Sequence, residues 1–342
     1  MKPGATVLVT GTRGSVGRVV ATRLLERGFV VRGLDRNDAP DFLRARPGFT
    51  GFRADLADLD AVRPLLEGVS AVIHCAGLNP DRLHEGREAF HRSNVLAAEN
   101  VLRAAHEATA ERAVLLTSVA VLRRRYGAVT PDDAGPHAPV NHYHWSKVEA
   151  ERQIFGLDVR DSLTVTVLRP CSIYGEGMRY KWHEIISLVR NGRMFLIGQE
   201  DAAYPLVHVD DVARAVLLTL DAPAAALHRQ AITLTATEPC SIARIVNFIA
   251  DYYRVARPRR LPYLPVLCAS MLLRLVPAAL KPQHLREIRP HNIRDYRYSL
   301  IFDHTKAERL LGFRAEVPFA DGMTRMLDSL GPGAPPASST AQ

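Results

Sequence analysis

The sequence predicts an α/β protein in which a doubly wound parallel sheet is joined to a smaller, discontinuous, mainly helical lobe. Three observations predict this class. Short β-rich apolar runs alternate with segments of helical period through the first half of the chain. A glycine-rich turn connects the first apolar run to the first helical segment, and the alternation stops after residue 174. Strands that alternate with helices need crossover connections, which produce a parallel sheet covered on both faces.

Seven apolar runs are long enough to be strands of this sheet. In chain order they are Thr6–Val9, Val30–Asp35, Phe49–Arg53, Ala71–Cys75, Ala113–Thr117, Leu163–Leu168 and Ala231–Thr235. Apolar residues recur with the helical period in Val16–Arg27, Ala61–Leu66, Phe90–Ala108 and Tyr143–Phe155, and in VDDVARAVLLTL before the last strand. We therefore expect a helix in each of these segments.

A glycine-rich turn follows the first strand, with the sequence Thr10-Gly11-Thr12-Arg13-Gly14-Ser15-Val16-Gly17. Its glycines permit a tight turn, a close approach of a pyrophosphate to backbone N–H groups, and close packing of the next helix against the strand. The N-terminus of that helix adds positive dipole. Because a strand precedes the turn and a helix follows it, we predict a Rossmann-type dinucleotide site.

The identity of the dinucleotide depends on the end of the second strand. Asp35 ends that strand, and a carboxylate there accepts hydrogen bonds from the adenosine ribose hydroxyls and repels a 2′-phosphate. Arg13 and Arg36 lie where a guanidinium could hold a 2′-phosphate instead. NAD is therefore the expected cofactor, and NADP stays an alternative.

The change of pattern after residue 174 sets the expected domain boundaries. Residues 1–174 form the Rossmann domain, which segment 206–236 completes. Residues 175–205 and 237–330 form the substrate-binding lobe. The last residues, 331–342, are rich in Gly, Pro and Ser and are expected to form a disordered tail.

A tyrosine and a lysine four positions apart, Tyr143 and Lys147, lie in an expected helix. This spacing puts both side chains on one face, one turn apart. A phenol with a pKa of about 10 is a poor proton shuttle at neutral pH, and a nearby cation stabilises its phenolate. Ser118 follows the fifth strand, at the edge where open α/β sheets bind ligands. We expect these three residues to act together, whereas Asn94 is more typical of a capping or core amide.

Further motifs extend along most of the chain: TGTRGSVG, Asp55-Leu56, VIHCAG, NVLAAENVLRAA, TSVAV, YHWSK, LRPCSIYGEG, VHVDDVARAV and FDHTKAERLLGF. Together they resemble the extended short-chain dehydrogenases/reductases, also called the NAD-dependent epimerase/dehydratase family. The 3β-hydroxysteroid dehydrogenases are grouped with this family. The separation of Ser118 from Tyr143, 25 positions, is also typical of it.

The resemblance implies a role for each matching residue. Ser118, Tyr143 and Lys147 would form a catalytic triad, with Tyr143 as general acid/base while hydride passes between a substrate carbon and the nicotinamide. Lys147 would also bond the nicotinamide ribose, and Asn94 would hold a relay water. The cofactor would further contact residues at the ends of three strands of the sheet: Asp55, Leu56, Cys75, Ala76, Gly77 and Pro170.

Four functions are known or conceivable for such a protein, and the sequence favours them to different degrees. A 4,6-dehydratase carries an Asp-Glu pair directly after the hydroxyl residue, but Val119 and Ala120 follow Ser118. A sugar-nucleotide 4-epimerase usually holds its diphosphate with an arginine before the VHVDD-like motif, where this chain has Tyr204. Arg294 or Arg297 lies near a second clamp position, so an epimerase stays an alternative.

An alcohol dehydrogenase or ketone reductase needs an apolar pocket instead. The run LPYLPVLCASMLLRLV supplies apolar surface in the second lobe, although it is equally consistent with a helix of the lobe core. An intact triad argues against a protein that only binds NAD, which is the further alternative. We expect an NAD(P)-dependent oxidoreductase that interconverts a secondary alcohol and a ketone on a small, fairly apolar substrate.

The net charge of +8 is concentrated in one segment. Residues 252–297 contain ten Lys/Arg residues and two acids, and the basic residues lie on both sides of the apolar run. In the rest of the chain the positive and negative charges are equal in number. The chain has no nucleic-acid reading motif, so we expect no nucleic-acid partner. The segment is consistent with a lid over an anionic or amphiphilic substrate, a helix on an anionic membrane surface, or a solvated basic exterior.

The remaining features concern the compartment. The four cysteines (Cys75, Cys171, Cys240 and Cys268) are widely spaced, so we expect reduced thiols and no metal site. The longest uncharged apolar run, Leu261 to Leu273, has 13 residues, and a membrane-spanning helix needs about 20. The N-terminal segment reads as a strand rather than a signal peptide. We expect a cytoplasmic protein with a small-molecule substrate, and a homodimer.

Overall fold

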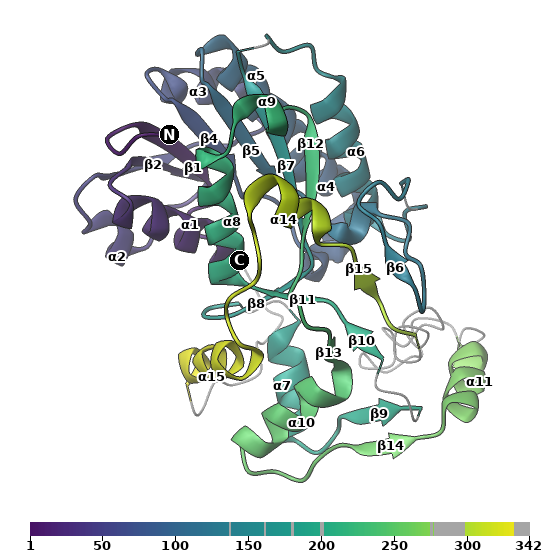
Figure 1. Cartoon of the computed structure of the whole chain (residues 1–342). Helices are drawn as coiled ribbons and strands as arrows, with labels where there is room; N and C mark the ends of the chain where they lie inside the picture. The colour runs from purple at the N-terminus through teal and green to yellow at the C-terminus, as the bar shows by residue number, and fades with distance from the viewer. Residues whose placement is uncertain are drawn as a thin grey trace.

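A seven-stranded parallel sheet forms one part of the molecule, and a smaller lobe of helices and short strands lies at its carboxyl edge (Figure 1). The computed structural model describes residues 1–331 except 137, 161, 179–180, 199–201, 274–275 and 277–297. The strands of the sheet are β1 (Thr6–Thr10), β2 (Val30–Asp35), β3 (Phe49–Arg53), β4 (Ala71–His74), β5 (Arg112–Leu116), β7 (Thr164–Pro170) and β12 (Gln230–Leu234). Each predicted strand is present, within two residues at either end.

The strand order explains where a ligand can bind. The strands lie in the order β12-β7-β5-β4-β1-β2-β3, and all neighbouring pairs are parallel. Val7 of β1 pairs with Val31 of β2 on one side and with Ala71 of β4 on the other. The direction of chain progress therefore reverses between β1 and β4. In open α/β sheets, ligands bind at the carboxyl ends of the strands that flank such a switch point.

Helices cover both faces of the sheet, because successive side chains of a strand point to opposite sides. The helices are α1 (Ser15–Glu26), α2 (Asp41–Arg44), α3 (Leu59–Val62), α4 (Gly86–Phe90), α5 (Ala97–Glu107), α6 (His142–Gly156), α8 (Val209–Asp221), α9 (Ala224–Leu227) and α14 (Thr305–Leu311). Val7 and Val9 enter a core shared with α1 and α8, whereas Leu8 enters a second core shared with α5 and α6. The predicted doubly wound α/β fold is thus confirmed.

Two of the predicted helices are divided into shorter pieces. The segment 61–66 joins the end of α3 to a 3₁₀ turn over Arg63–Leu66, whose second residue is a proline. The segment 90–108 starts at the last residue of α4, passes through a π-helix over His91–Leu96 and ends in α5. Single π-turns are frequent at functional sites, and Asn94 lies in this one.

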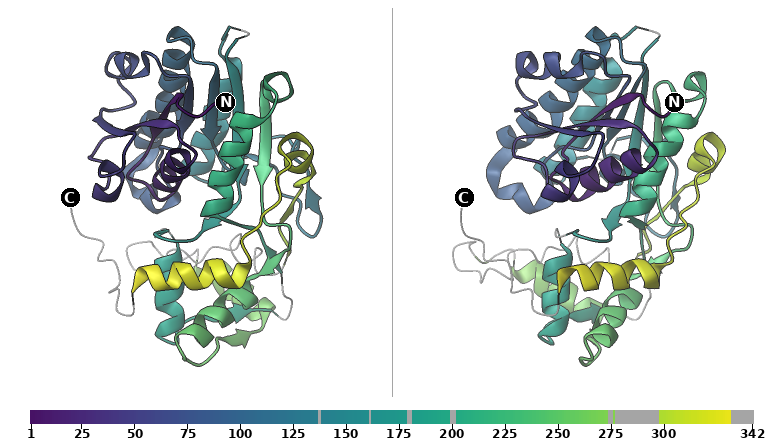
Figure 2. Two further views of the ribbon diagram at one scale, coloured as in Figure 1. Left: turned by 60° about the vertical axis from the view of Figure 1, so that its left-hand side comes forward. Right: turned by 90° about the vertical axis from the view of Figure 1, so that its left-hand side faces the viewer.

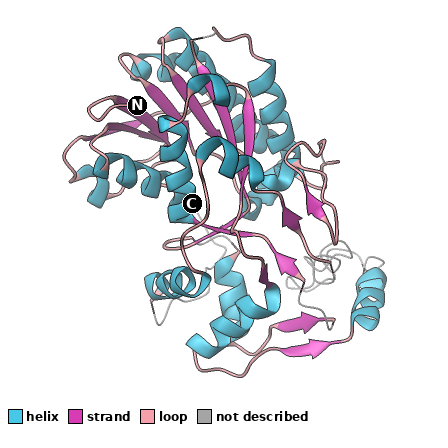
Figure 3. Cartoon of the chain, in the orientation of Figure 1, coloured by secondary structure: helices cyan, strands magenta, loops and turns pink. Residues whose placement is uncertain are grey.

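Within the residues that the structure describes, the second lobe contains four longer helices and several short strands (Figure 3). Strands β8 (Ser172–Tyr174) and β11 (Leu206–His208) connect the sheet domain to this lobe. The described elements of the lobe itself are α7 (Trp182–Arg190), β9 (Phe195–Ile197), β10 (Ala203–Tyr204), β13 (Cys240–Ser241), α10 (Ile242–Tyr252), β14 (Arg259–Leu261), α11 (Tyr263–Leu273) and α15 (Phe319–Leu330). Trp182 and Ile186 of α7, Ile249 of α10 and Met323 of α15 share one core. Figure 2 shows α15 crossing this lobe beneath the sheet.

One segment departs from the predicted domain division. Residues 237–330 were assigned to the lobe, yet Ala307 and Leu311 of α14, and Phe313 after it, belong to the core that lies on the α1–α8 face of the sheet. The apolar side of α14 packs against β12 and α8, and β15 (Ile301–Phe302) pairs with β6 (Val129–Thr130). The other predicted boundaries stay predictions. The expected tail beyond Gly331 lies outside the described residues, as do the basic residues from Arg274 to Arg297.

Candidate active site

The glycine-rich turn has the geometry that a dinucleotide needs. Gly11 has a φ of +74°, and its N–H donates to the Leu34 carbonyl over 2.8 Å. A Cβ atom on Gly17 would lie 2.2 Å from the Gly11 carbonyl oxygen, so only glycine lets α1 start this close to the turn. Gly14 precedes α1 and has no side chain to occupy the first N–H groups of the helix, which therefore point toward an anion site.

A cleft of about 390 Å³ opens at this turn, at the switch point of the sheet. It is lined by most of the predicted cofactor-binding residues: Gly11, Gly14, Ser15, Val16, Gly17, Asp35, Arg36, Asp55, Leu56, Cys75, Ala76 and Gly77. The predicted Arg13, Pro170, Tyr143 and Lys147 lie outside this lining. The lining also includes residues that the sequence analysis missed: Leu78, Asn79, Asp81, Arg92, Ser93, Ala97, Ile173 and Met178.

Two carboxylates mark the end of the cleft expected to hold the adenosine. Asp35 accepts a hydrogen bond from the Arg13 N–H over 3.1 Å, so the backbone of the turn orients it. Asp55 accepts from the Ala57 N–H over 3.0 Å and from the Arg92 guanidinium over 2.8 Å. Burial opposes its ionisation, but these two donors keep the pKa of Asp55 below its usual value. Arg92 lines the cleft, and only its contact with Asp55 in the folded chain shows that it belongs to the site.

The segment after β4 forms the floor of the cleft. The Thr10 hydroxyl accepts from the N–H groups of Cys75 and Ala76, each over 3.2 Å, and pairs with Nδ1 of His74 over 2.9 Å. Burial lowers the pKa of His74 to about 3 and raises that of Cys75 to about 12. Burial thus favours the neutral form of both side chains.

Ser118, Tyr143 and Lys147 come together behind the floor of the cleft, next to Gly77. Ser118 follows β5, Tyr143 and Lys147 lie on the first turns of α6, and the Ser118 hydroxyl is near enough to that of Tyr143 to act against the rise in its pKa. The Lys147 Nζ atom lies 5.8 Å from the centre of the Tyr143 ring. A Cβ atom built on Gly77 would lie 3.6 Å from that Nζ, so the ammonium borders the floor of the cleft.

Burial sets the proton affinities of this group. It raises the pKa of Tyr143, against the hydrogen bond from Ser118. It lowers the pKa of Lys147 to about 8, although the carboxylate of Glu151 partly restores the charge. Burial therefore moves the pKa values of the two groups apart, although those of free lysine and tyrosine are close together, and it favours the neutral form of both.

A buried ion pair supports this helix from below. The Glu151 carboxylate accepts from Arg169 Nε over 2.9 Å and from the Thr117 hydroxyl over 2.5 Å, and it also contacts Nη2 of Arg169. Arg169 in turn donates to the Asp132 carbonyl over 2.8 Å. These bonds join the ends of β5 and β7 to α6, one turn beyond Lys147. Glu151 was not identified from the sequence, although its spacing of four from Lys147 placed it on the same helix face.

Asn94 makes the bonds of a core amide. Its Oδ1 atom accepts from the Leu78 N–H over 2.6 Å, and its Nδ2 atom donates to the Leu78 carbonyl over 3.1 Å and to the Ser146 hydroxyl over 2.9 Å. It therefore fixes the loop after Gly77 against α6. The water-holding role implied by the family resemblance stays a prediction.

The loop after β8 joins the second lobe to the nucleotide cleft. The Ser15 hydroxyl donates to the Gly177 carbonyl over 2.8 Å, and Arg18 donates to the Glu176 carbonyl over 3.0 Å. Ser329 of α15 accepts from the Gly177 N–H over 3.2 Å. The side chain of Ser15 is thus used to hold this loop, and Met178 of the same loop lines the cleft.

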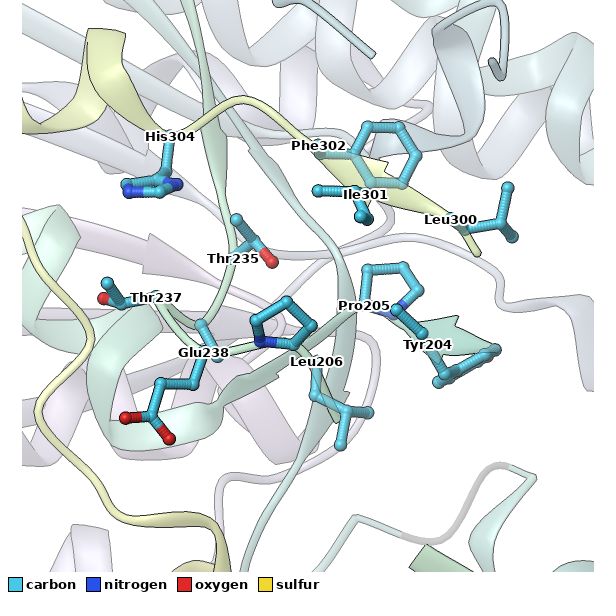
Figure 4. Close-up of a pocket in the computed structure, with 13 residues that line it drawn as sticks. Tyr204, Pro205, Leu206, Thr235, Thr237, Glu238, Leu300, Ile301, Phe302 and His304 are labelled. Carbon is cyan, nitrogen blue, oxygen red and sulfur yellow. The ribbon is translucent and has the colours of Figure 1, made fainter. Parts of the chain in front are cut away.

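Tyr204 lines a small pocket of about 60 Å³ in the lobe (Figure 4), and two polar side chains outside that lining contact its hydroxyl. Segments 204–206, 235–239 and 300–304 surround it. The Tyr204 hydroxyl is 2.8 Å from the Ser172 hydroxyl and 2.5 Å from Lys181 Nζ. Burial opposes ionisation of Tyr204, but Lys181 and Ser172 keep its pKa below its usual value. Tyr204 occupies the position at which a diphosphate-binding arginine was expected in an epimerase.

A nucleotide cleft at the switch point of a doubly wound sheet, with a Tyr–Lys pair beside its floor, is typical of a class of nicotinamide-dependent enzymes. A family model described as "NAD dependent epimerase/dehydratase family" matches residues 7–234. The chain therefore belongs to the NAD-dependent epimerase/dehydratase family. The predicted family and its NAD cofactor are confirmed at this level.

Individual relatives carry two kinds of description. The mouse sterol-4-alpha-carboxylate 3-dehydrogenase, decarboxylating, is 26% identical over 333 residues, which cover 94% of this chain and 90% of that protein. A 3 beta-hydroxysteroid dehydrogenase/Delta 5-->4-isomerase of Mycobacterium tuberculosis is 28% identical over 220 residues, or 62% of this chain and 59% of that protein. The structure of MoeE5 in complex with UDP-glucuronic acid and NAD is similar with a TM-score of 0.73 at 25% identity, covering 95% of this chain and 98% of that one.

Proposed function

We propose that the protein is an NAD-dependent dehydrogenase that interconverts a secondary alcohol and a ketone on an apolar, sterol-like substrate. The observation that carries this proposal is the grouping of Ser118 and Tyr143 with Lys147, whose Nζ atom borders the floor of the nucleotide cleft at Gly77. The mouse and M. tuberculosis relatives, named for 3-hydroxyl oxidation on sterols and steroids, support the substrate class.

Each residue has a defined task in this reaction. The glycine-rich turn and the N-terminus of α1 hold the pyrophosphate, and Asp35 holds the adenosine ribose. NAD held in this cleft would supply the acceptor for the hydride that leaves the carbinol carbon. The Tyr143 phenolate takes the hydroxyl proton, Ser118 donates a hydrogen bond to the same oxygen, and the Lys147 ammonium stabilises the phenolate. In the reverse direction Tyr143 returns the proton to the alkoxide as the ketone is reduced.

A sugar-nucleotide 4-epimerase is the second candidate. The similarity to MoeE5 with its bound UDP-glucuronic acid favours it, and Lys181 places a cation beside Tyr204. A tyrosine cannot replace the bidentate fork with which an arginine holds a diphosphate. For that reason we place the dehydrogenase first.

Reduced cofactor distinguishes the two reactions. The purified protein is mixed with NAD and a 3β-hydroxysterol, or with NAD and UDP-glucuronic acid, and absorbance of NADH is followed while products are identified by mass spectrometry. We expect net NADH and a 3-ketone from the sterol. Interconversion of the nucleotide sugar without net NADH, together with an unreacted sterol, would establish the epimerase instead.

A further inference from the structure

Helix α11 is apolar on all sides and yet lies at the protein surface. Its sequence, YLPVLCASMLL, contains no charged residue. A helix of this composition is ordinarily buried in a core or a membrane. Leu264 and Leu272 are each 65% exposed and Met271 is 52% exposed, the three highest values for large apolar side chains in the part of the chain that the structure describes.

The exposed residues form one face of the helix. Leu264, Cys268, Met271 and Leu272 follow the i, i+4, i+7, i+8 spacing of a single helical stripe and are all exposed. Ser270 lies on the opposite side, is fully buried and donates to the Leu267 carbonyl over 2.7 Å. The helix therefore has one buried side and presents an outer apolar face, and it lies at the periphery of the lobe in Figure 1.

Positive charge borders this face. Arg259 and Arg260 of β14, directly before α11, are both exposed, and Arg254 is exposed at the start of the same segment. Residues 252–273 contain four arginines and no acidic residue in sequence. One of the four, Arg257, pairs with Asp251 of α10 over 2.7 Å, which leaves the net charge of this region positive.

We propose that the outer face of α11 docks the protein on a membrane surface that contains anionic lipids. An apolar helical face inserts among the acyl chains at the headgroup boundary, while the adjacent arginines remain at the level of the lipid phosphates. The helix has 11 residues, about 16 Å in length, so it lies in the plane of the membrane rather than across it. None of the helices in the described ranges is long and apolar enough to span a bilayer.

A fluorophore on Cys268 tests the proposal directly. Cys268 lies on the outer face and is exposed, whereas burial raises the pKa of Cys75, Cys171 and Cys240 to about 11 or 12, so an environment-sensitive maleimide labels Cys268 selectively. We expect a blue shift with phosphatidylcholine vesicles that contain phosphatidylglycerol, and a much smaller shift without it. Raised salt should weaken the binding, because it screens the arginines.

A matched control places the same fluorophore on another exposed surface of the protein. Phe42 of α2 is 51% exposed on the sheet domain, so the double variant Phe42→Cys/Cys268→Ser places the label at a similarly exposed apolar position. We expect no phosphatidylglycerol-dependent shift from this label. An equal shift from both positions would show nonspecific adsorption and overturn the proposal.

Two further variants separate the apolar and the electrostatic contributions. Leu264→Gln/Leu272→Gln should weaken vesicle binding at least about tenfold, and Arg259→Gln/Arg260→Gln about fivefold for each charge removed. Both should keep the NAD affinity of the unchanged protein. Absence of any binding to anionic vesicles at low salt contradicts the proposal, as does a blue shift that depends on protein concentration alone, which would assign the face to contact between copies of the chain.

Discussion

Two regions of the molecule contain the same three residue types in different arrangements. The first, here called the sheet set, lies at the carboxyl edge of the sheet beside the cleft, and the second, called the lobe set, lies in the second lobe. The sheet set is Ser118, Tyr143 and Lys147, and the lobe set is Ser172, Tyr204 and Lys181.

The difference lies in how each lysine meets its tyrosine. In the lobe set, Lys181 Nζ contacts the Tyr204 hydroxyl directly, and the pKa of Tyr204 is lowered. In the sheet set, Lys147 Nζ is 5.8 Å from the centre of the Tyr143 ring, borders the cleft floor at Gly77, and leaves the pKa of Tyr143 raised by burial. A shifted phenol pKa therefore does not identify the active site. Its position beside a nucleotide cleft does.

The largest expected effect comes from removing each lysine in turn. Lys147→Met should lower kcat about 10²- to 10⁴-fold, because the phenolate of Tyr143 loses its cation. Lys181→Met should change kcat only a few-fold, since Tyr204 is not beside the cleft. Steady-state NADH formation measures both. A greater loss in Lys181→Met than in Lys147→Met would reverse the assignment of the two sets.

The ion pair beneath the sheet set should matter mainly for stability. Glu151→Gln leaves the buried Arg169 without its counter-charge, and we expect a loss of about 3–5 kcal/mol in the free energy of unfolding. The control is Glu149→Gln, whose partner Arg152 is exposed, with an expected loss of at most about 1 kcal/mol. Urea unfolding measures the free energy lost in each variant. Equal losses would show that the buried ion pair contributes no more to stability than the exposed one.

The pKa of Lys147 predicts a particular pH dependence of stability. The pKa is about 8 in the folded chain and 10.5 in the unfolded chain, so below pH 8 the lysine is charged in both states and its burial is costly. Between pH 8 and 10.5 the folded chain holds the neutral amine while the unfolded chain still binds the proton, so stability rises with pH. Compared with Lys147→Met, the unchanged protein should gain unfolding free energy across this range. A constant difference would show that Lys147 is not desolvated.

The smallest expected effect belongs to the lobe set. Ser172→Ala removes one hydrogen bond to Tyr204 and should cost about 1 kcal/mol of unfolding free energy. It should leave NADH formation unchanged, and we expect the pKa of Tyr204 to rise because Ser172 helps to lower it. A spectrophotometric tyrosine titration and the activity assay check these outcomes. A large loss of activity would place the lobe set in the catalytic machinery.

The features that sequence could predict are those fixed by local backbone requirements. The turn at Gly11, Gly14 and Gly17 is such a case, because the close approach of α1 to the Gly11 carbonyl excludes any side chain at Gly17. The pairing of Tyr143 with Lys147 follows equally from helical spacing. These motifs sufficed to identify most of the cleft lining.

The features that sequence could not predict depend on contacts between distant segments. Arg92 donates a hydrogen bond to Asp55, which is 37 positions away in the sequence. Tyr204 contacts Lys181 and Ser172 only because the tertiary fold brings these distant segments together. The placement of α14 against the sheet is a further case, because its apolar stripe indicates a buried face without indicating which core buries it. The π-helix around Asn94 could not be predicted either, because the spacing of apolar residues there does not differ from that of an ordinary helix.

Replacement of each tyrosine by phenylalanine tests the central claim most directly. With NAD and a secondary alcohol that the unchanged protein oxidises, Tyr143→Phe should lower kcat by at least about 10²-fold while its NAD affinity, measured by fluorescence titration, is unchanged. Tyr204→Phe should keep kcat within a few-fold. If Tyr143→Phe retains full activity with normal NAD binding, Tyr143 is not the proton-transfer residue and the proposed function of the sheet set is wrong.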